Sequence, residues 1–194
     1  ELFTLLQPYG YIDYELLEGK DYRGIDTAFI SRFKMSDPRL HYITFSGEFK
    51  DKDTRPILEV TMKTGNQNIT IYNVHFPAGY HDVSMRIDSL NLLKDLLQSH
   101  TNPAIALGDF NVNSSEDNKY KIYQSQEDEW FIAHLIGCSD CKGTHYYNYG
   151  KTWSFLDTIF LSKNRLINFV PDSVKIHRTK DNSYPDTGKP IRFN

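Results

Sequence analysis

The sequence predicts an α/β fold in which β-sheet predominates. Eight short segments combine apolar runs or alternation with strand-forming residue types, and aromatic residues make up 14% of the chain, as is typical of pleated, half-buried surfaces. One long amphipathic segment, residues 82–99, separates two of these strands, which is typical of a helix packed on a sheet. With 194 residues, the chain suits one domain, 1–194, with a substantial core.

The expected elements run in order from a short helix at the start of the chain. Leucines and a phenylalanine form an apolar stripe over residues 1–8, and Pro8-Tyr-Gly10 ends it. Strands are expected over residues 11–17, 26–33, 39–46, 56–63, 68–75, 103–108, 155–162 and 171–178. A turn signal at residues 64–68 joins two of them as a hairpin.

Two further helices are expected. Over residues 82–99 the apolar positions trace one face, with Arg86, Asp88, Lys94 and Asp95 on the outside, and Asn102-Pro103 bars continuation. A weaker helix is expected over about 116–136, where Gln, Asp and Tyr are frequent. Residues 180–190 show the composition of an irregular loop.

Composition narrows the classes of protein. The net charge is −3 and the pI about 6.2, so a nucleic-acid enzyme needs a local positive patch or a metal to manage phosphate charge. No apolar run approaches the roughly 18 residues of a membrane span. Cys138 and Cys141 form a single Cys-x-x-Cys, either incidental or a local disulfide. The compartment, cytoplasmic or secreted, stays open.

Asp109 and Asn111 are the strongest candidates for a functional site. They follow the apolar run 103–108 two residues apart, so both side chains can face one metal ion or one phosphate. A carboxylate can hold a divalent cation or orient a water, and an amide can donate to a developing phosphate oxygen. An ordinary turn is the alternative, because Gly, Asp and Asn are common turn formers.

His75 and Asp157 extend this candidate site. His75 ends the strand 68–75 and precedes a loop, and a histidine in this place is either catalytic or merely structural. Asp157 lies within the apolar strand 155–162, so its carboxylate needs a partner or a shifted pKa. An internal ion pair is the alternative for Asp157.

Arg55 and Trp153 are candidate substrate-binding residues. A guanidinium just before strand 56–63 can bind phosphate through two hydrogen bonds, although a solvated loop arginine is equally consistent with the sequence. Trp153 can stack on a base or sugar, or pack at the edge of the core.

These residues resemble the motifs of the endonuclease/exonuclease/phosphatase superfamily of metal-dependent phosphohydrolases. Gly108-Asp-Phe-Asn111 is similar to its G-D-x-N motif, Asn73-Val-His75 to N-x-H, and residues 156–162 to its L-D-x-I-x-x-S strand. Residues 23–31 also resemble a stretch of bacterial members, and Thr54-Arg-Pro56 resembles the arginine-proline step that precedes the next strand. The resemblance implies a DNase I-like fold of two face-to-face sheets flanked by helices, incomplete at both ends in this chain.

The resemblance also implies roles for individual residues. Asp109 orients or deprotonates the attacking water, Asn111 stabilises the pentacovalent phosphate, and His75 contacts or protonates a phosphate oxygen. Arg55 holds the phosphate, and Asp157 orients a histidine from a later S-D-H motif. Asp109 and Asn111 are also the expected ligands of Mg²⁺ or Mn²⁺, since hard cations prefer oxygen.

The chain departs from the family pattern at both ends. No Ser-Asp-His occurs in it, and the early strand with its metal-binding Glu is missing. We therefore expect a fragment with part of the site. The expected activity is metal-dependent hydrolysis of a phosphate ester, foremost a DNA or RNA phosphodiester. The alternatives are a lipid or inositol phosphate, or a non-catalytic binding module on the same fold.

Overall fold

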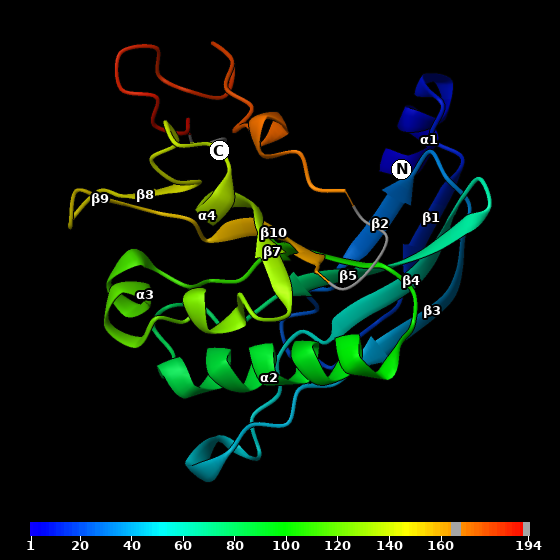
Figure 1. Ribbon diagram of the computed structural model, residues 1–194, viewed down its shortest axis with the longest axis horizontal. Coiled ribbons are helices and arrows are strands. Elements are labelled where there is room, and N and C mark those ends of the chain that lie inside the picture. Colours follow the sequence, from blue (N-terminus) through cyan, green and yellow to red (C-terminus); the bar gives the residue numbers. More distant parts are fainter. Residues whose placement is uncertain (164–167, 192–194) are drawn as a thin grey trace.

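A six-stranded mixed sheet is the centre of the molecule. The computed structural model describes residues 1–163 and 168–191, and the order across the sheet is β3 (Met35–His41), β4 (Ile57–Thr64), β5 (Gln67–His75), β6 (Ala104–Asp109), β10 (Asp157–Ser162) and β7 (Trp130–Ile132) (Figure 1). β5 and β6 are parallel, and every other pair is antiparallel. The predicted α/β class is therefore confirmed.

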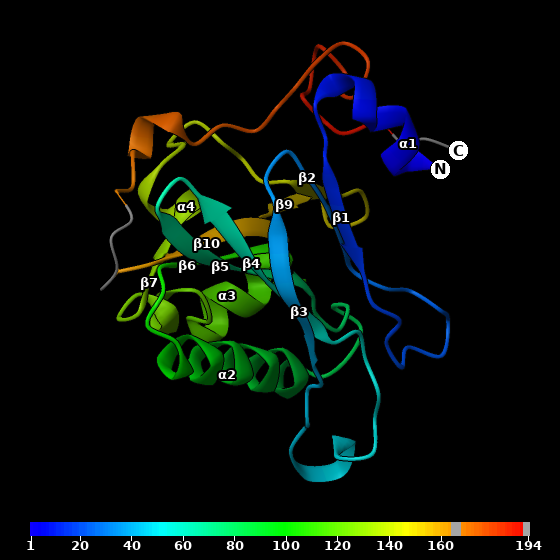
Figure 2. The same ribbon diagram turned by 90° about the vertical axis from the view of Figure 1, so that its right-hand side faces the viewer.

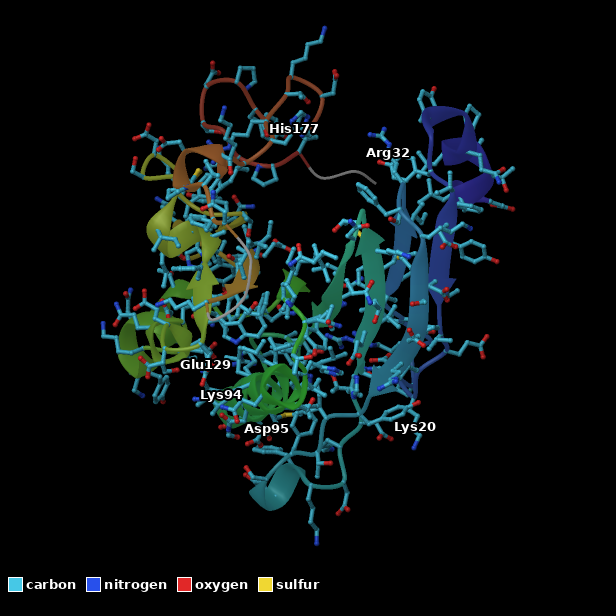
Figure 3. All side chains as sticks on the ribbon, turned by 45° about the vertical axis from the view of Figure 1, so that its right-hand side comes forward. Lys20, Arg32, Lys94, Asp95, Glu129 and His177 are labelled. Carbon is cyan, nitrogen blue, oxygen red and sulfur yellow. A yellow bond between two sulfur atoms is a disulfide. The ribbon has the colours of Figure 1, made fainter. Side chains whose placement is uncertain are left out.

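Helix α2 (Val83–Ser99) covers one face of this sheet and connects β5 to β6. Asp82 caps its first turn, since its Oδ1 accepts a hydrogen bond from the Ser84 amide at 2.8 Å. Met85, Leu90, Leu93 and Leu97 are buried against the sheet. Asp95 lies on the side away from it, and Lys94 lies on the flank of the helix, 4.0 Å from Glu129 (Figure 3). Arg86 differs from the expectation: it is fully buried, because its guanidinium binds backbone carbonyls and Glu116.

The opposite face of the sheet carries a smaller sheet, made of β1 (Asp13–Leu16) and β2 (Ala28–Ser31) (Figure 2). Phe29 of β2 packs against a second apolar cluster of Met35, Val60 and Ile71. The amide of Asn73 donates to the carbonyl of Ala28 at 2.8 Å, which ties this small sheet to β5. The fold thus consists of several sheets and few helices, and apolar side chains pack on both faces of the central sheet.

The N-terminal helix is confirmed as α1 (Leu2–Leu6), followed by a 3₁₀ turn, Gln7–Tyr9. Strand β3 lies earlier than the predicted 39–46. Its Pro38 reads as a turn residue, but an edge strand accepts proline at a bulge, and the pairing of β3 with β4 shifts register between Ser36 and Arg39.

The predicted helix over 116–136 is wrong, because the chain breaks into short elements there. They are α3 (Ser114–Tyr120), a 3₁₀ turn (Gln124–Gln126), β7 and α4 (Ala133–Ile136). The left-handed backbone of Lys121, φ 54°, ends α3, and the apolar residues beyond it, Ile122 and Tyr123, are buried in the core.

Residues 171–178 begin with a 3₁₀ turn, Pro171–Ser173, and no strand follows within the part described. A hairpin of β8 (His145–Tyr147) and β9 (Thr152–Ser154) was not expected. Cys138 and Cys141 form a disulfide. In the segments 1–163 and 168–191, no helix is long and apolar enough to cross a membrane.

Candidate active site

His75, Asp109 and Asp157 form one row across three neighbouring strands. His75 and Asp109 are register partners at the carboxyl ends of the parallel strands β5 and β6, and Asp157, the first residue of β10, is the antiparallel partner of Asp109. Residues paired across strands lie on the same face of a sheet. Three side chains far apart in the sequence therefore meet at one edge, as expected.

The location of Asp157 corrects one expectation. The carboxylate was expected inside an apolar strand, where a buried charge needs a partner. It stands at the beginning of β10 instead and is exposed, and its backbone amide donates to Thr144 Oγ1 at 3.0 Å. The Asp157 side chain is therefore open to solvent beside Asp109.

Gly108 permits the close approach of β5 and β6 beside this row. Its φ is +134°, and a Cβ at this position would lie 2.1 Å from the carbonyl oxygen of Val74. A side chain here would force the two strands apart, so glycine is required for the pairing that aligns His75 with Asp109.

A tight turn after β6 holds Asn111. The backbone amide of Asn111 donates to Asp109 Oδ1 at 2.8 Å. The φ of Asn111 is 54°, in the left-handed region that asparagine tolerates. The side-chain Nδ2 donates to the carbonyl of Phe76 at 2.9 Å, and the residue is buried. The turn suggested by composition thus exists, and it is also what fixes Asn111 next to Asp109 and His75.

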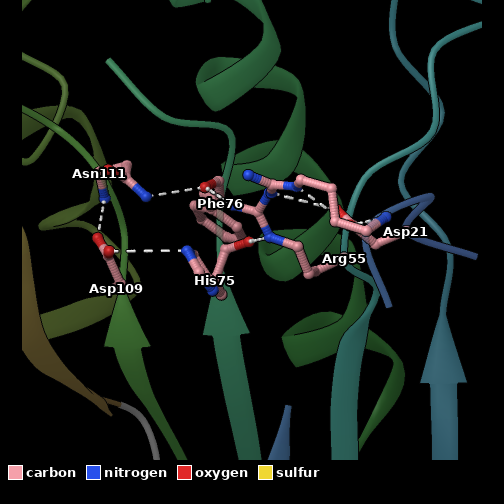
Figure 4. Close-up of polar contacts among 7 residues, drawn as sticks. Asp21, Arg55, His75, Phe76, Asp109 and Asn111 are labelled. Atoms are coloured by element: carbon pink, nitrogen blue, oxygen red, sulfur yellow. Dashed lines mark hydrogen bonds and ion pairs between the residues drawn. The ribbon is translucent and has the colours of Figure 1, made fainter. Parts of the chain in front are cut away.

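Arg55 is held within the protein, in contrast to both expectations for it. Its side chain is 5% exposed; Nε donates to the carbonyl of His75 at 3.2 Å and Nη2 to that of Phe76 at 2.8 Å (Figure 4). Nη1 lies 3.5 Å from Asp21 Oδ2. The guanidinium therefore fixes the backbone that follows β5, and the Phe76 carbonyl accepts from both Arg55 and Asn111.

The carboxyl of Asp109 has an unusual proton affinity. Burial and the nearby charge of Asp157 raise its pKa to about 6, against the opposing effect of the Asn111 hydrogen bond. Burial, followed by the positive charges of Arg55 and Arg23, lowers the pKa of His75. The imidazole is therefore neutral at pH 7, with its Nε2 3.8 Å from Asp109 Oδ2.

Asp21 anchors the outer end of this network. Burial opposes its charge, but hydrogen bonds from Arg23 and the charges of Arg23 and Arg55 outweigh that effect and lower the pKa of Asp21. No sequence pattern pointed to Asp21. Its contact with Arg55 spans 34 residues, so no local signal could have revealed it.

Trp153 lies apart from the row. Its ring packs 5.2 Å from the ring of Tyr146, with the Arg178 guanidinium 5.5 Å above it. Thr152 and Ser154, its neighbours in β9, line the hollow next to Asn111, whereas Trp153 lines a different one, toward the C-terminal segment. The tryptophan therefore faces away from the side of the hairpin that borders the candidate site.

The oxygen atoms of the row and of Asn111 are the type of ligand that a hard cation prefers, but they are too few to fill its coordination sphere. Asp109 and Asp157 offer carboxylate oxygens and Asn111 an amide oxygen, and a cation between the carboxylates would offset the repulsion that raises the pKa of Asp109. Within the described segments, no three His, Cys, Asp or Glu side chains gather closely enough to hold a metal ion. Magnesium fits such a partial set, because it keeps several waters and binds through one or two carboxylates plus substrate phosphate.

The chain is similar to a known protein family and to several solved structures. The model of the endonuclease/exonuclease/phosphatase family matches residues 2–174, and no curated protein matches the chain. A family protein from Leptotrichia buccalis is 24% identical with a TM-score of 0.60, over 84% of this chain and 65% of its own.

Two further solved structures share the fold. Truncated TDP2 from Caenorhabditis elegans is 14% identical with a TM-score of 0.57, over 82% of this chain and 64% of its own. The human Nocturnin catalytic domain, solved with a bound sulfate, is 18% identical with a TM-score of 0.55, over 82% and 63%. The chain thus spans slightly less than two thirds of the length of these structures.

Proposed function

Because the chain belongs to the endonuclease/exonuclease/phosphatase family, we propose that the protein hydrolyses a phosphate ester with the help of Mg²⁺ or Mn²⁺. The observation that supports this most directly is the row of His75, Asp109 and Asp157 beside the buried Asn111. A base, hydrogen-bond donors and oxygen ligands for a cation are the groups that phosphoryl transfer requires in one place.

Asp109 is the residue that orients the attacking water in this proposal. In the metal-free protein the pKa of this carboxyl is about 6, so the group is ionised at pH 7 and can accept a hydrogen bond from the water. Oδ1 accepts the turn bond from the backbone amide of Asn111, and Oδ2 lies on the side of His75; the water in this proposal is placed at Oδ2.

His75 and Asn111 stabilise the phosphate. A neutral imidazole donates a hydrogen bond from one nitrogen only, and Nε2 of His75 is the atom that faces Asp109. Asn111 has one amide hydrogen on Phe76 and a second one left for a phosphate oxygen. Arg55 acts as a positioning residue, since it fixes the carbonyls of His75 and Phe76.

Asp109, Asn111 and Asp157 would hold the cation, with water and the substrate completing its ligands. The bound ion would neutralise charge on the phosphate during in-line attack. The preferred substrate is a nucleic-acid phosphodiester, and lipid or inositol phosphates are the alternative within the same chemistry.

The test is hydrolysis of bis(p-nitrophenyl) phosphate with Mg²⁺, with Mn²⁺ and with EDTA. We expect metal-dependent turnover, and a loss of roughly 10²- to 10⁴-fold in Asp109→Asn. Asp95→Asn, an exposed carboxylate on α2, is the matched control and should keep wild-type activity. Turnover that survives EDTA or Asp109→Asn would contradict the proposal, and bound phosphate ester without any turnover would favour the binding module.

A further inference from the structure

A hollow of about 620 Å³ adjoins Asn111, on the side of the molecule where the β8–β9 hairpin faces α3 (Figure 1). Three segments line it: the loop before α2, the turn after β6 with the first residues of α3, and the β8–β9 hairpin with Leu156. Ligand sites commonly measure about 300–1,000 Å³. A phosphate held at Asn111 would therefore have one of its ester substituents at the mouth of this hollow.

The walls of the hollow are tied together by buried polar residues. Arg86, fully buried, donates to the carbonyls of Pro77, Ala78 and His81 and forms an ion pair with Glu116 of α3. Ser154 of β9, also buried, accepts a hydrogen bond from the Ser114 amide at 3.0 Å. The loop, the helix and the hairpin are thus joined, and a preformed site binds a ligand at a lower entropic cost.

The described part of the lining of the hollow contains one basic side chain, His145, and no carboxylate. Tyrosine rings, hydroxyls and amides predominate, and among the described residues that line it there is no Lys, Arg, Asp or Glu. An inositol polyphosphate carries several anionic phosphate groups, which proteins usually bind with lysine and arginine side chains. A lipid chain calls for aliphatic walls, and Leu156 is the one large aliphatic side chain in the lining described.

Two exposed tyrosines stand at the hollow on different segments. Tyr80, from the loop, is 76% exposed and Tyr147, from β8, is 53% exposed. The Tyr147 ring lies beside Gly150, where a Cβ would be 2.8 Å from the ring atom Cδ1, so a larger residue at position 150 would displace the ring. Exposed aromatic rings stack on nucleobases irrespective of sequence.

We propose that this hollow binds the nucleoside part of a nucleic-acid phosphate ester, with Tyr80 and Tyr147 as the residues that determine specificity. The assignment rests on the proposed function, since it uses the phosphate position at Asn111. Hydroxyls of the lining, such as those of Ser114 and Thr152, supply hydrogen-bond partners for the sugar and the base edge.

The experiment compares calorimetric binding of thymidine 5′-phosphate, methyl phosphate and inositol 1,4,5-trisphosphate at one Mg²⁺ concentration. We expect thymidine 5′-phosphate to bind most tightly, and Tyr80→Ala and Tyr147→Ala each to weaken it roughly 5- to 100-fold. Methyl phosphate should bind all variants equally. Tyr120→Ala, a 45% exposed tyrosine of α3 that does not line the hollow, is the matched control.

Hydrolysis of two p-nitrophenyl esters separates the assignment from the proposed function. Both tyrosine variants should keep wild-type turnover of methyl p-nitrophenyl phosphate and lose efficiency on thymidine 5′-(p-nitrophenyl phosphate). Equal effects on the two esters, or tighter binding of the trisphosphate than of the nucleotide, would overturn the assignment alone. Absence of both binding and turnover for every ester would overturn the proposed function as well.

Discussion

Replacing Asp109 by asparagine should remove activity and stabilise the metal-free fold at neutral pH. Burial and Asp157 raise the pKa of the carboxyl from its ordinary 3.8 to about 6, so the ionised form is disfavoured in the folded protein. Asparagine keeps the Oδ1 acceptor for the Asn111 amide, now at 2.8 Å. The substitution therefore removes an unfavourable charge and leaves the turn in place.

The size of the effect follows from linkage. A pKa raised to about 6 corresponds to at most about 3 kcal/mol, and because the side chain is 33% exposed, solvent screening reduces this to about 1 kcal/mol. The folded state binds more protons than the unfolded state between about pH 4 and pH 6, so stability falls as pH rises through that window. The full penalty is present above about pH 6 and absent below about pH 4.

Urea denaturation in EDTA at pH 4 and pH 7.5 measures this difference. We expect Asp109→Asn to match the wild type at pH 4 and to exceed it by about 1 kcal/mol at pH 7.5. Asp95→Asn should show no difference at either pH. Mg²⁺ should stabilise the wild type and leave Asp109→Asn unchanged. A variant that is less stable than the wild type at pH 7.5 without metal would refute the reasoning.

Three further substitutions test the supports of the site. Gly108→Ala should cost about 3 kcal/mol or more in urea denaturation, because its Cβ would lie 2.1 Å from the Val74 carbonyl; a cost under 1 kcal/mol would contradict the close approach. Arg86→Met should cost about 3–5 kcal/mol by the same assay, since it leaves Glu116 and three carbonyls without their donor. Arg55→Lys should lower kcat/KM by about 10- to 100-fold, because an ammonium does not reproduce the fork that holds two carbonyls; unchanged kinetics would exclude positioning.

Local chemistry explains what the sequence could predict. The turn at Gly108-Asp-Phe-Asn111 is closed by a local hydrogen bond between Asn111 and Asp109. The strand that precedes it and the segment 68–75 are rich in apolar residues, so the sequence predicted where each strand ends. The row itself also required the pairing of three strands. The family resemblance suggested that pairing, because hydrophobic periodicity alone does not predict which strands are neighbours.

Contacts between distant segments explain what the sequence could not predict. The helical pattern places Arg86 on the face expected to be solvated. Arg86 is buried because the loop of residues 77–81 folds over it and its carbonyls accept hydrogen bonds from the guanidinium. The β8–β9 hairpin determines which side chains of β9 face the site. The sequence gives no strong turn signal for this hairpin, so the direction of the Trp153 side chain could not be predicted. Tyr80 and Tyr147 likewise become neighbours of one hollow only through the fold.

Ladder register brings His75, Asp109 and Asp157 to one edge of the sheet, so the length of the strands is more constrained than the length of the turns between them. Exposed turns between β6 and β10, such as residues 148–151 between β8 and β9, can lengthen, shorten or be exchanged without displacing the row, provided the ladder and the buried residues of this segment, Asn111 among them, are kept. Deleting a single residue inside β6 would instead turn the acid to the other side of the sheet. Substrate range is thus free to diversify in the connections, while the reacting groups tolerate no change of length.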